Sequence, residues 1–378
     1  MLKVLHIIKS PSFETDGRLQ KWVKQLYKRG FHSTVFIVED GNKNTVENFY
    51  ENTVKKQSLF FRKYFKQRSG YLFKIPEYLK KTSSYICEFE GEIIVFHDVQ
   101  QYLNLFFHLI SNKNRTHKVV WDLHELPHNI LLNNFAFRPF LRFLLNNVDA
   151  VVYTNVERRE YIKDHLKGLK EKRFFILNNY PDSGYINSDF ENVDIETFDN
   201  SKPYILWLGA GIETRNFGAF LRAYKRVNDQ FNLVVIGNID PKFEDELGVY
   251  RSENKLFNKF VNQSDIKKYI DNSFLSVVLY NTSSANNLLC EPNRLYQLVS
   301  RDIPVVVGNN PTMANLINKL EVGVVLRDDG SSSDNIYEGM QRIIDNYRTF
   351  KSISQSKNYS ELFSWEKQID EIIDFIIG

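Results

Sequence analysis

The 378-residue sequence has little of several residue types that mark special classes of protein. Its only two cysteines, Cys87 and Cys290, lie far apart and outside any CxxC or Cys/His cluster. This excludes a disulfide framework and a structural zinc site, and it fits a reducing cytoplasm. Glycine (17) and proline (10) are scarce while 43% of residues are hydrophobic, which excludes disorder and low complexity. The chain is therefore globular and long enough for two domains.

Charge of one sign and long apolar runs are also missing. Lysine and arginine (49) barely exceed aspartate and glutamate (46), so the net charge of +3 disfavours a dedicated nucleic-acid binder. The apolar stretch in residues 1–9 is too short for a signal peptide, and no run approaches the ~18 apolar residues of a membrane span. The sequence predicts a cytoplasmic protein, with the inner face of the cell membrane as a candidate peripheral location.

What the sequence does contain is an alternation of short β-branched runs with amphipathic segments, which is typical of βαβ units around a parallel sheet. A helix is predicted over 18–29, with Gly30 placed to end it. The strands expected in the first half are 4–8, 34–38, 93–96, 119–121, 150–153 and 174–177.

A second α/β series begins near residue 204. Its expected strands are 204–208, 233–236, 275–278 and 305–307, and its expected helices are near 217–228, 263–270 and 294–299. The acidic stretch 181–203 has no strong periodicity and is predicted to be the interdomain linker. Two such domains facing each other would place the strand carboxyl ends around a shared cleft.

Three candidate site segments follow predicted strands of the first half. Gly17 stands at a helix entrance, where a diphosphate can approach backbone N–H groups, although an ordinary turn has the same pattern. Two His-acid pairs, His97-Asp98 and His124-Glu125, each end a strand, where histidine can donate to a substrate hydroxyl. From the pattern alone, a structural role is the alternative for both histidines.

In the second half, Gly209 and Gly211 end a strand and precede Arg215 and Asn216. Two glycines and one guanidinium can hold a diphosphate. Because Thr214 breaks a GxGxxG pattern and no Gly-Lys-Ser/Thr follows, neither a classical dehydrogenase nor a P-loop NTPase is supported. By spacing alone, an ordinary turn remains the alternative.

The densest polar stretch, residues 280–297, precedes a helix that Pro292 opens. It describes a site for a hydroxylated, anionic ligand, and a solvated loop is the alternative.

Residues 55–81 form a local basic segment, with nine lysines and arginines against the single acid Glu77 and aromatic residues interleaved. Such a segment can lie on an anionic lipid surface, where each nearby cation contributes roughly 1 kcal/mol. A solvated face with a buried aromatic side is the equal alternative.

Together these segments resemble a GT-B glycosyltransferase of the family 4 type, a group of retaining enzymes that use nucleotide sugars. The resemblance covers nearly the whole chain. In chain order its pieces are Asp16-Gly17-Arg18, Asp122-Leu-His-Glu125, residues 148–154 and 178–182, Gly209 with Arg215-Asn216, residues 235–237, Pro292-Asn293-Arg294-Leu-Tyr296, residues 303–306 and Phe363-Ser-Trp-Glu366.

The resemblance implies an α/β GT-B fold with two Rossmann-like domains facing across a cleft. It implies an acceptor-binding domain over 1–185, a nucleotide-sugar-binding domain over 203–355, and a C-terminal segment, 356–378, whose helix packs back on the first domain. It also assigns His124 a catalytic place facing the reacting sugar. The donor-binding residues would be Gly17, Gly209, Gly211, Arg215, Asn216, Glu291, Asn293, Arg294 and Gln297, and the acceptor side would hold Arg18, His97, Asp98 and Glu125.

Two departures concern donor recognition and metal. The family often carries two glutamates spaced as E-x7-E, but here these positions are Leu289 and Gln297, with Glu291 a candidate substitute. The sequence has no DxD motif, so we expect no metal and no cofactor beyond the donor itself.

The sequence therefore predicts a retaining, metal-independent hexosyltransferase in surface polysaccharide biosynthesis. Its partners would be a nucleotide sugar, a glycan or lipid-linked acceptor, and an anionic membrane surface through 55–81, with no nucleic acid. Two alternatives stay open: a nucleotide-sugar 2-epimerase, and a catalytically degenerate GT-B subunit that binds glycans or supports a partner.

Overall fold

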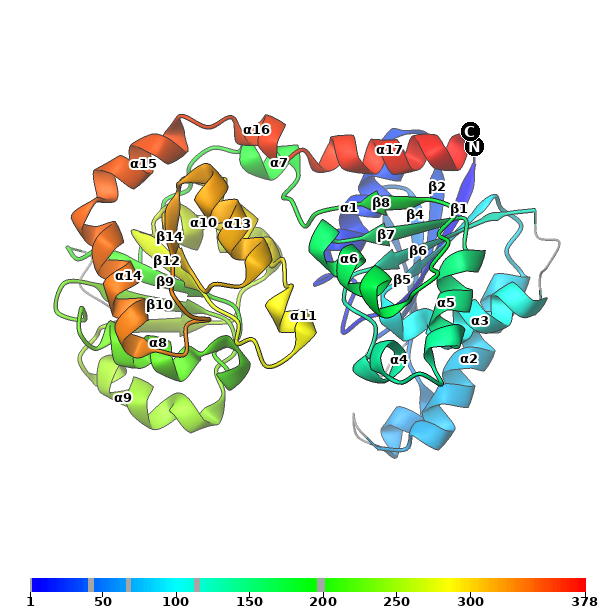
Figure 1. The fold of residues 1–378 in the computed structure, drawn as a ribbon, viewed down its shortest axis with the longest axis horizontal. Helices are drawn as coiled ribbons and strands as arrows, with labels where there is room; N and C mark the ends of the chain where they lie inside the picture. The colour runs from blue at the N-terminus through cyan, green and yellow to red at the C-terminus, as the bar shows by residue number, and fades with distance from the viewer. Residues whose placement is uncertain (1, 40–43, 66–68, 112–115, 196–200) are drawn as a thin grey trace. The chain divides into compact units, whose positions relative to one another are not determined.

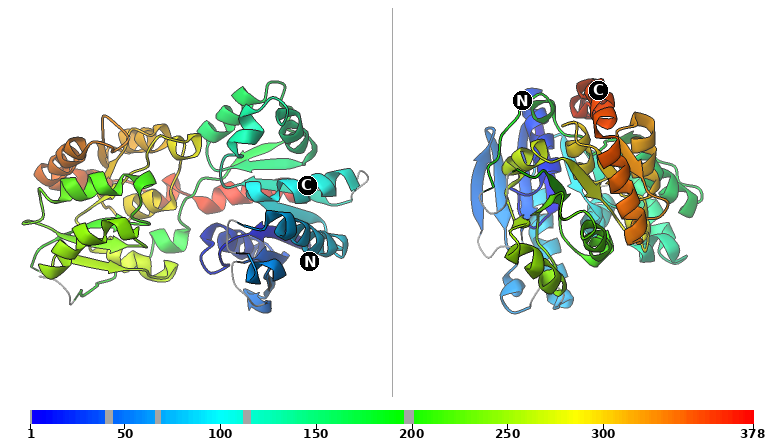
Figure 2. Two further views of the ribbon diagram at one scale, coloured as in Figure 1. Left: turned by 90° about the horizontal axis from the view of Figure 1, so that it is seen from below. Right: turned by 90° about the vertical axis from the view of Figure 1, so that its left-hand side faces the viewer.

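The computed structural model describes residues 2–39, 44–65, 69–111, 116–195 and 201–378, and it divides into two compact units (Figures 1 and 2). The first unit comprises Met1–Asn178 together with Glu366–Gly378, and the second comprises Asn179–Trp365. Within the described ranges, no helix combines the length and the apolar character that a bilayer crossing needs.

The first unit is built on an eight-stranded sheet in the order β3-β4-β2-β1-β5-β6-β7-β8. All neighbouring strands are parallel except β3 and β4, which form an antiparallel pair at one edge. The strand order reverses between β1 and β5, and such a switch point is where open α/β sheets bind ligands, outside the carboxyl ends of the strands. The strands are β1 (Lys3–Lys9), β2 (His32–Val38), β3 (Thr45–Phe49), β4 (Asn52–Gln57), β5 (Ile93–His97), β6 (Lys118–Leu123), β7 (Ala150–Tyr153) and β8 (Phe174–Ile176).

Helices cover the two faces of this sheet (Figure 1). The helix after β1 begins where Asp16 accepts a hydrogen bond from the Leu19 amide, and Gly30 follows its end with φ 81°. Its apolar side, which includes Leu19 and Trp22, is fully buried. The helical segments are α1 (Gly17–Lys28), η1 (Phe60–Lys63), α2 (Tyr71–Cys87), η2 (Val99–Gln101), α3 (Tyr102–Ser111), α4 (Asn129–Asn133), α5 (Arg138–Asn147), α6 (Val156–His165) and α17 (Trp365–Ile377).

The second unit is built on a six-stranded, all-parallel sheet in the order β11-β10-β9-β12-β13-β14. This is the doubly wound order of a Rossmann fold, with its switch point between β9 and β12. Alternate side chains of β9 enter two different cores, Trp207 on one face and Leu206 on the other. The strands are β9 (Tyr204–Leu208), β10 (Asn232–Ile236), β11 (Leu256–Lys259), β12 (Leu275–Val278), β13 (Val305–Val307) and β14 (Gly323–Val325).

The helices of the second unit lie on both faces of this sheet. They are α7 (Ser183–Ile186), η3 (Glu213–Arg215), α8 (Phe217–Tyr224), η4 (Pro241–Phe243), α9 (Glu244–Ser252), η5 (Gln263–Asp265), α10 (Ile266–Asp271), α11 (Ala285–Leu288), α12 (Asn293–Val299), α13 (Pro311–Leu320), α14 (Ser333–Asp345), α15 (Tyr347–Gln355) and α16 (Tyr359–Leu362).

The stretch expected to link the domains, 181–203, belongs to the second unit wherever the structure describes it. Asp182 caps α7, Lys267 pairs with Glu191 at 2.8 Å, and Ile195 is buried in the second core. The polar composition of this stretch predicts a linker. In the structure, however, its acidic side chains have partners, some of them far along the chain, and the stretch is part of the second unit. The unit boundary thus falls at Asn178–Asn179 and not at 185, and residues 196–200 lie outside the described ranges.

The expected C-terminal segment 356–378 is divided between the units. Tyr359 and Phe363 pack in the second core, so α16 belongs there. Helix α17 alone returns to the first unit, where Asp370 accepts from Gln25 at 3.0 Å and the Phe375 ring lies 5.4 Å from that of Phe175.

Candidate functional site

The expected site residues of the first unit gather around one carboxylate at the end of β6. Asp122 is fully buried and accepts two hydrogen bonds from one edge of the Arg18 guanidinium, at 3.1 Å from Nε and 2.7 Å from Nη2. Trp22 donates to the same carboxylate at 3.0 Å. Burial alone would raise the pKa of Asp122, but Arg18 and the neighbouring histidines hold it well below its ordinary value. The carboxylate is therefore a fixed negative charge that orients its neighbours.

Two buried histidines extend this cluster away from solvent. The Nδ1 atom of His97 lies 3.1 Å from Asp122, and its Nε2 atom lies 2.8 Å from Nδ1 of His6. Burial lowers the pKa of both rings, which favours their neutral forms. The bonding pattern then makes Nδ1 of His97 the donor to Asp122 and Nδ1 of His6 the donor to His97. His97, expected on the acceptor side, is fully buried, so its side chain supports Asp122 and does not face a ligand.

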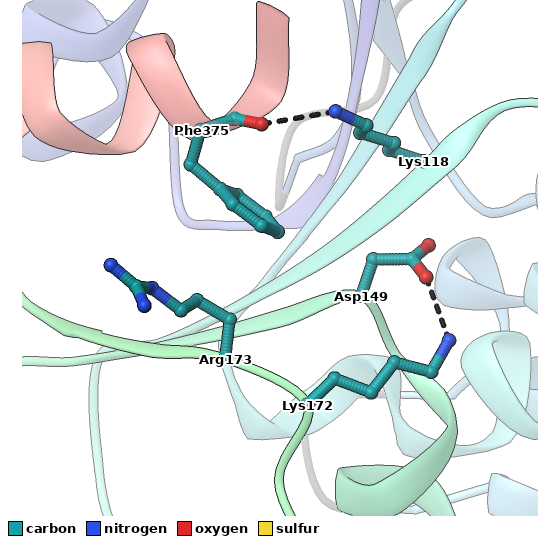
Figure 3. A pocket seen from close by; sticks show the side chains of 5 residues that line it. All are labelled: Lys118, Asp149, Lys172, Arg173 and Phe375. Carbon is teal, nitrogen blue, oxygen red and sulfur yellow. Dashed lines mark hydrogen bonds and ion pairs between the residues drawn. The ribbon is translucent and has the colours of Figure 1, made fainter. Parts of the chain in front are cut away.

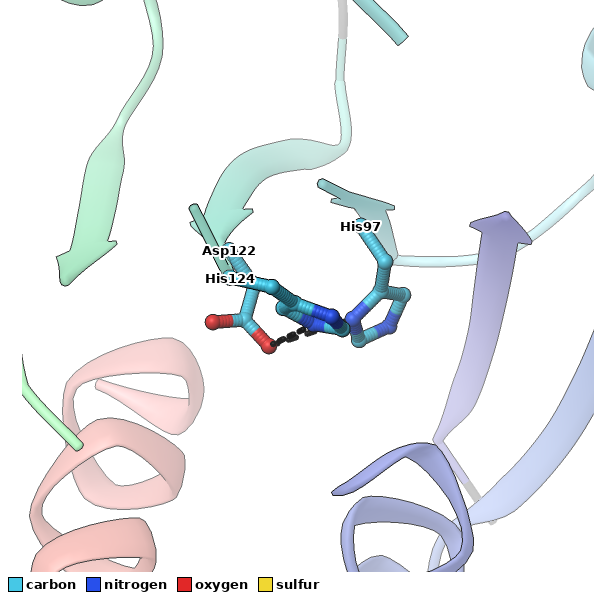
Figure 4. A group of neighbouring side chains, drawn as sticks. All are labelled: His97, Asp122 and His124. Carbon is cyan, nitrogen blue, oxygen red and sulfur yellow. Dashed lines mark hydrogen bonds and ion pairs between the residues drawn. The ribbon is translucent and has the colours of Figure 1, made fainter. Parts of the chain in front are cut away.

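His124 is the exposed member of the group shown in Figure 4. Its Nε2 atom lies 3.1 Å from Asp122, and its side chain is 19% exposed, whereas those of Asp122 and His97 are 0% exposed. Burial opposes the charged ring, but the Asp122 carboxylate outweighs this effect and raises the pKa of His124. His124 is thus a hydrogen-bond donor at the carboxyl edge of the sheet, in the place that the sequence predicted for a functional group.

His97, Asp122 and His124 bring one potential metal ligand atom each to within 4.8 Å of one another. Their surroundings do not fit a resident cation, because the Asp122 oxygens already accept from Arg18 and Trp22, and the guanidinium carries the positive charge. The cluster is better described as a neutralised carboxylate than as a metal site.

The remaining residues expected in this unit differ in their placement. Asp98 has φ 69°, and its carboxylate accepts from the Val99 amide, so it caps a turn after β5. Arg18 is buried and bonded to Asp122 and to the Leu177 carbonyl, so it positions Asp122. Glu125 is exposed. An added Cβ at Gly17 would meet nothing within 4 Å, so the first turn of α1 borders open space, as a ligand-facing helix start requires.

In the second unit, Gly209 lies under two guanidinium groups. It has φ 111°, and an added Cβ would stand 2.3 Å from Nη1 of Arg294 and 2.4 Å from Nη1 of Arg215. The backbone of Gly237 packs against this turn. A Cβ added at Gly237 would stand 2.4 Å from the Gly209 carbonyl oxygen. Only glycine at 209 leaves room for both arginines at the carboxyl end of β9.

These two arginines have no carboxylate partner among the described residues. Arg294 donates to the Leu208 carbonyl at 2.6 Å, and its Nε atom is buried without a hydrogen-bond partner in the described part of the chain. Burial, with repulsion from Arg215, lowers the pKa of Arg294 to about 10. The Tyr280 ring lies 4.9 Å from Arg294 and 5.3 Å from Arg215. Two adjacent guanidinium groups over a glycine turn have the charge and the donors to bind a doubly charged anion.

Other residues expected to bind the donor support the turn. Asn216 is in the left-handed conformation (φ 53°) and donates to the Asp329 carbonyl at 2.9 Å, which fixes the start of α8. The Gly211 amide donates to the Asn238 carbonyl at 2.8 Å. Asn216 and Gly211 thus fix the glycine turn through hydrogen bonds to backbone carbonyls.

The two positions at which the resembled family often has glutamates are Leu289, just before α12, and Gln297, within α12. Glu291 is buried, and its carboxylate accepts from the Tyr296 hydroxyl. Gln297 and Leu289 are also nearly buried, whereas Asn293 is exposed in the first helical turn. The structure therefore provides Glu291 with a protein partner of its own.

Three residues that take part in these two groups of side chains were not predicted from the sequence. Tyr280 stood inside the polar stretch without a role, and its position two residues after a predicted strand was the only available signal. Trp22 and His6 looked like ordinary core residues of a helix and a strand, and no local pattern marks the hydrogen bonds that they make with Asp122 and His97.

Comparisons with solved structures identify the class of this fold. No protein-family model and no curated protein sequence matches the chain. Among solved structures it is similar to sucrose-phosphate synthase from Thermosynechococcus elongatus, with 13% identity, TM-score 0.74, and coverage of 100% of this chain and 99% of that one. Anabaena HepE in complex with UDP matches with 12% identity, TM-score 0.67 and coverage of 99% and 100%.

A third similar structure is an α,α-trehalose-phosphate synthase from Burkholderia xenovorans in complex with glucose-6-phosphate, with 11% identity, TM-score 0.71 and coverage of 99% and 100%. These full-length similarities confirm the α/β GT-B fold, with two Rossmann-like units, that the sequence predicted. At such identities the likeness establishes the fold alone.

Proposed function

We propose that the protein is a retaining glycosyltransferase that takes a sugar from a nucleotide-diphosphate donor bound in the second unit. The observation that carries the proposal is the pair Arg215 and Arg294, two cations over Gly209 without a carboxylate partner in the described ranges. A diphosphate supplies the charge that this pair lacks, and planar guanidinium groups bind phosphate oxygens in pairs.

The site of each unit has its own part in this function. Arg215 and Arg294 would hold the diphosphate and stabilise the charge that grows on it as the sugar leaves. His124, kept protonated to a higher pH by Asp122, would donate a hydrogen bond to the transferred sugar or the acceptor. Similar structures hold UDP and, in the Escherichia coli trehalose-6-phosphate protein, UDP-2-fluoro glucose, which supports a nucleotide-sugar donor. The resemblance to family 4 enzymes supports retention and independence from metal.

A direct test is calorimetric titration of the whole protein with UDP-, GDP-, ADP- and TDP-sugars. At least one donor should bind, and Arg215→Gln should weaken it by about tenfold or more, since a charge-assisted contact to phosphate contributes at least ~1.5 kcal/mol. Arg226→Gln is the matched control, because Arg226 lies in the same unit and pairs with Asp334 on the surface. The proposal fails if no donor binds or if both variants bind alike.

A second candidate is a catalytically degenerate subunit, and the observation that favours it is the buried pair Leu289 and Gln297 at the glutamate positions. Donor binding without sugar transfer to any glycan or lipid-linked acceptor, and without hydrolysis, would favour this reading over the transferase.

The acceptor and the location are proposed as a lipid-linked glycan of a surface polysaccharide at the inner face of the membrane. The basic segment 55–81 gives partial support. Its cations do not form one surface, because Lys56 is buried in ion pairs with Glu14 and Glu47, and Lys66 and Arg68 lie outside the described residues.

A further inference from the structure

The backbone on both sides of Tyr280 is fixed against the segments that carry the two arginines of the second unit. On one side, the Leu279 carbonyl accepts a hydrogen bond from Nη2 of Arg294 at 3.4 Å. On the other side, the Asn281 amide donates at 2.9 Å to the carbonyl of Thr214, in the short helix η3. Neither contact involves an atom of the Tyr280 side chain, so both remain when that side chain is changed.

The Tyr280 ring is the contact that the two guanidinium groups share. Helix η3 ends with Arg215, whose Cζ atom lies 5.3 Å from the ring centroid, and Cζ of Arg294 lies 4.9 Å from it. The Arg215 side chain makes no hydrogen bond or ion pair with a described residue, so the ring is the electrostatic contact that restrains its charge. The Tyr280 hydroxyl likewise makes no hydrogen bond within the described ranges, so the hydroxyl does not position the ring.

Two adjacent cations need such a contact while no anion is present. The Nη1 atoms of Arg294 and Arg215 lie 2.3 and 2.4 Å from the same point, which is the position of a Cβ added to Gly209. Like charges this close repel each other. The negative face of an aromatic ring attracts a cation and offsets part of that repulsion. Without the ring, the half-buried Arg215 is free to turn towards solvent, and the converged pair is lost.

We propose that Tyr280 is a positioning residue, whose ring keeps Arg215 and Arg294 converged on one diphosphate before the donor binds. The inference rests on the proposed function, because the diphosphate group belongs to the donor of that reaction. Guanidinium groups that are already in place lose less conformational entropy on binding, so the ring contributes to donor affinity through the two arginines.

Two other ring–cation contacts involve cations that have additional partners. Lys118 lies 5.3 Å from the Phe375 ring, with which it lines a pocket of about 420 Å³, and it donates to the Phe375 carbonyl at 3.0 Å (Figure 3). Arg226 lies 3.5 Å from the Tyr337 ring and pairs with Asp334 at 2.8 Å. Tyr337 therefore offers a matched control in the same unit as Tyr280, since its cation keeps a partner when the ring is removed.

The test compares Tyr280→Phe, which keeps the ring, with Tyr280→Leu, which removes it. In the ligand-free protein, the ring current shifts the NMR resonance of the Arg215 side-chain Nε–H. We expect that shift to be lost in Tyr280→Leu and retained in Tyr280→Phe. Calorimetric titration with UDP, GDP, ADP and TDP should show an affinity about tenfold lower in Tyr280→Leu, the effect of two cation–ring contacts. Tyr280→Phe should retain most of the affinity, and Tyr337→Leu should bind as the unchanged protein does.

Because Tyr280 is half-buried, thermal unfolding is measured in parallel, and Tyr280→Met takes the place of Tyr280→Leu if that variant is unstable. Three results would overturn the inference. They are undiminished binding or an unchanged Arg215 resonance in Tyr280→Leu, equal losses in Tyr280→Leu and Tyr337→Leu, and equal losses in Tyr280→Leu and Tyr280→Phe, which would identify the hydroxyl as the group that acts.

Arg215→Gln separates this failure from failure of the proposed function. If Arg215→Gln weakens binding and Tyr280→Leu does not, the diphosphate site stands and only the role of Tyr280 is rejected. If none of the four nucleotides binds to the unchanged protein, both proposals are rejected.

Discussion

Arg18 and Asp122 are joined by two hydrogen bonds, of 2.7 and 3.1 Å, across 104 residues of sequence and with almost no exposure to solvent. The pair connects the first turn of α1 to the end of β6. It thus fixes the distance between the helix start at Gly17 and His124, the histidine that follows β6.

Removal of Arg18 should destabilise the first unit strongly. Arg18→Leu leaves the Asp122 carboxylate buried without its main counter-charge, a change that costs about 3–5 kcal/mol of unfolding free energy. Urea unfolding followed by hydrogen exchange in β1 and β6 measures it. In Arg226→Leu, which removes an exposed ion pair, the loss should stay within about 1 kcal/mol. Similar losses in the two variants would contradict the assigned role of the buried pair.

Gly209→Ala should abolish donor binding. The new Cβ would stand 2.3 Å from Arg294 and 2.4 Å from Arg215 on a backbone with φ 111°, so both guanidinium groups must move. Nucleotide-sugar titration should show a loss of at least ~100-fold, as expected when two charge-assisted contacts are disturbed. Gly248→Ala is the control, because an added Cβ at this position in α9 meets nothing. Retained affinity in Gly209→Ala would rule out the two-arginine site.

The titration of His124 should reveal its contact with Asp122. The Asp122 carboxylate raises the pKa of His124, whereas burial lowers the pKa of His97. As the pH is lowered, the NMR ring resonances of His124 should therefore titrate before those of His97. A raised pKa favours the protonated folded state. The contribution of His124 to the free energy of unfolding is therefore complete below its pKa in the unfolded chain, about 6.5. It declines as the pH rises through its pKa in the folded protein. Asp122→Asn should lower the pKa of His124, and an unchanged value would refute the assigned cause.

Chelation should leave transfer intact. The positive charge at the proposed diphosphate site comes from Arg215 and Arg294, and the sequence has no DxD motif. Activity measured in EDTA should match activity in added Mg²⁺. Complete loss in EDTA with recovery on addition of a divalent cation would reject metal independence.

The sheet centres were predictable from sequence because their strands are buried on both faces and read as apolar runs. The predicted strands 150–153, 204–208, 275–278 and 305–307 match β7, β9, β12 and β13 in their bounds. The edge strands β3 and β11 were missed, since strands that are open to solvent on one side keep polar residues such as Asn48 and Asn258.

The placement of candidate site residues was predictable where they directly follow a strand, as at His124 and Gly209. The buried placement of His97 was not predictable, because a histidine at a strand end can turn either to solvent or to the core, and its buried partner His6 lies 91 residues away. The convergence of Arg294 on Gly209 likewise depends on packing between two segments that share no local pattern.

Helix α17 also affects when the first unit can form during synthesis. Its buried Ile369, Ile372 and Ile373, and the bonds of Asp370 to Gln25 and Arg29, complete a unit whose other residues end at Asn178. On the ribosome, the whole second unit is translated before this last helix emerges. The first unit therefore obtains its last helix only after the entire second unit has been translated.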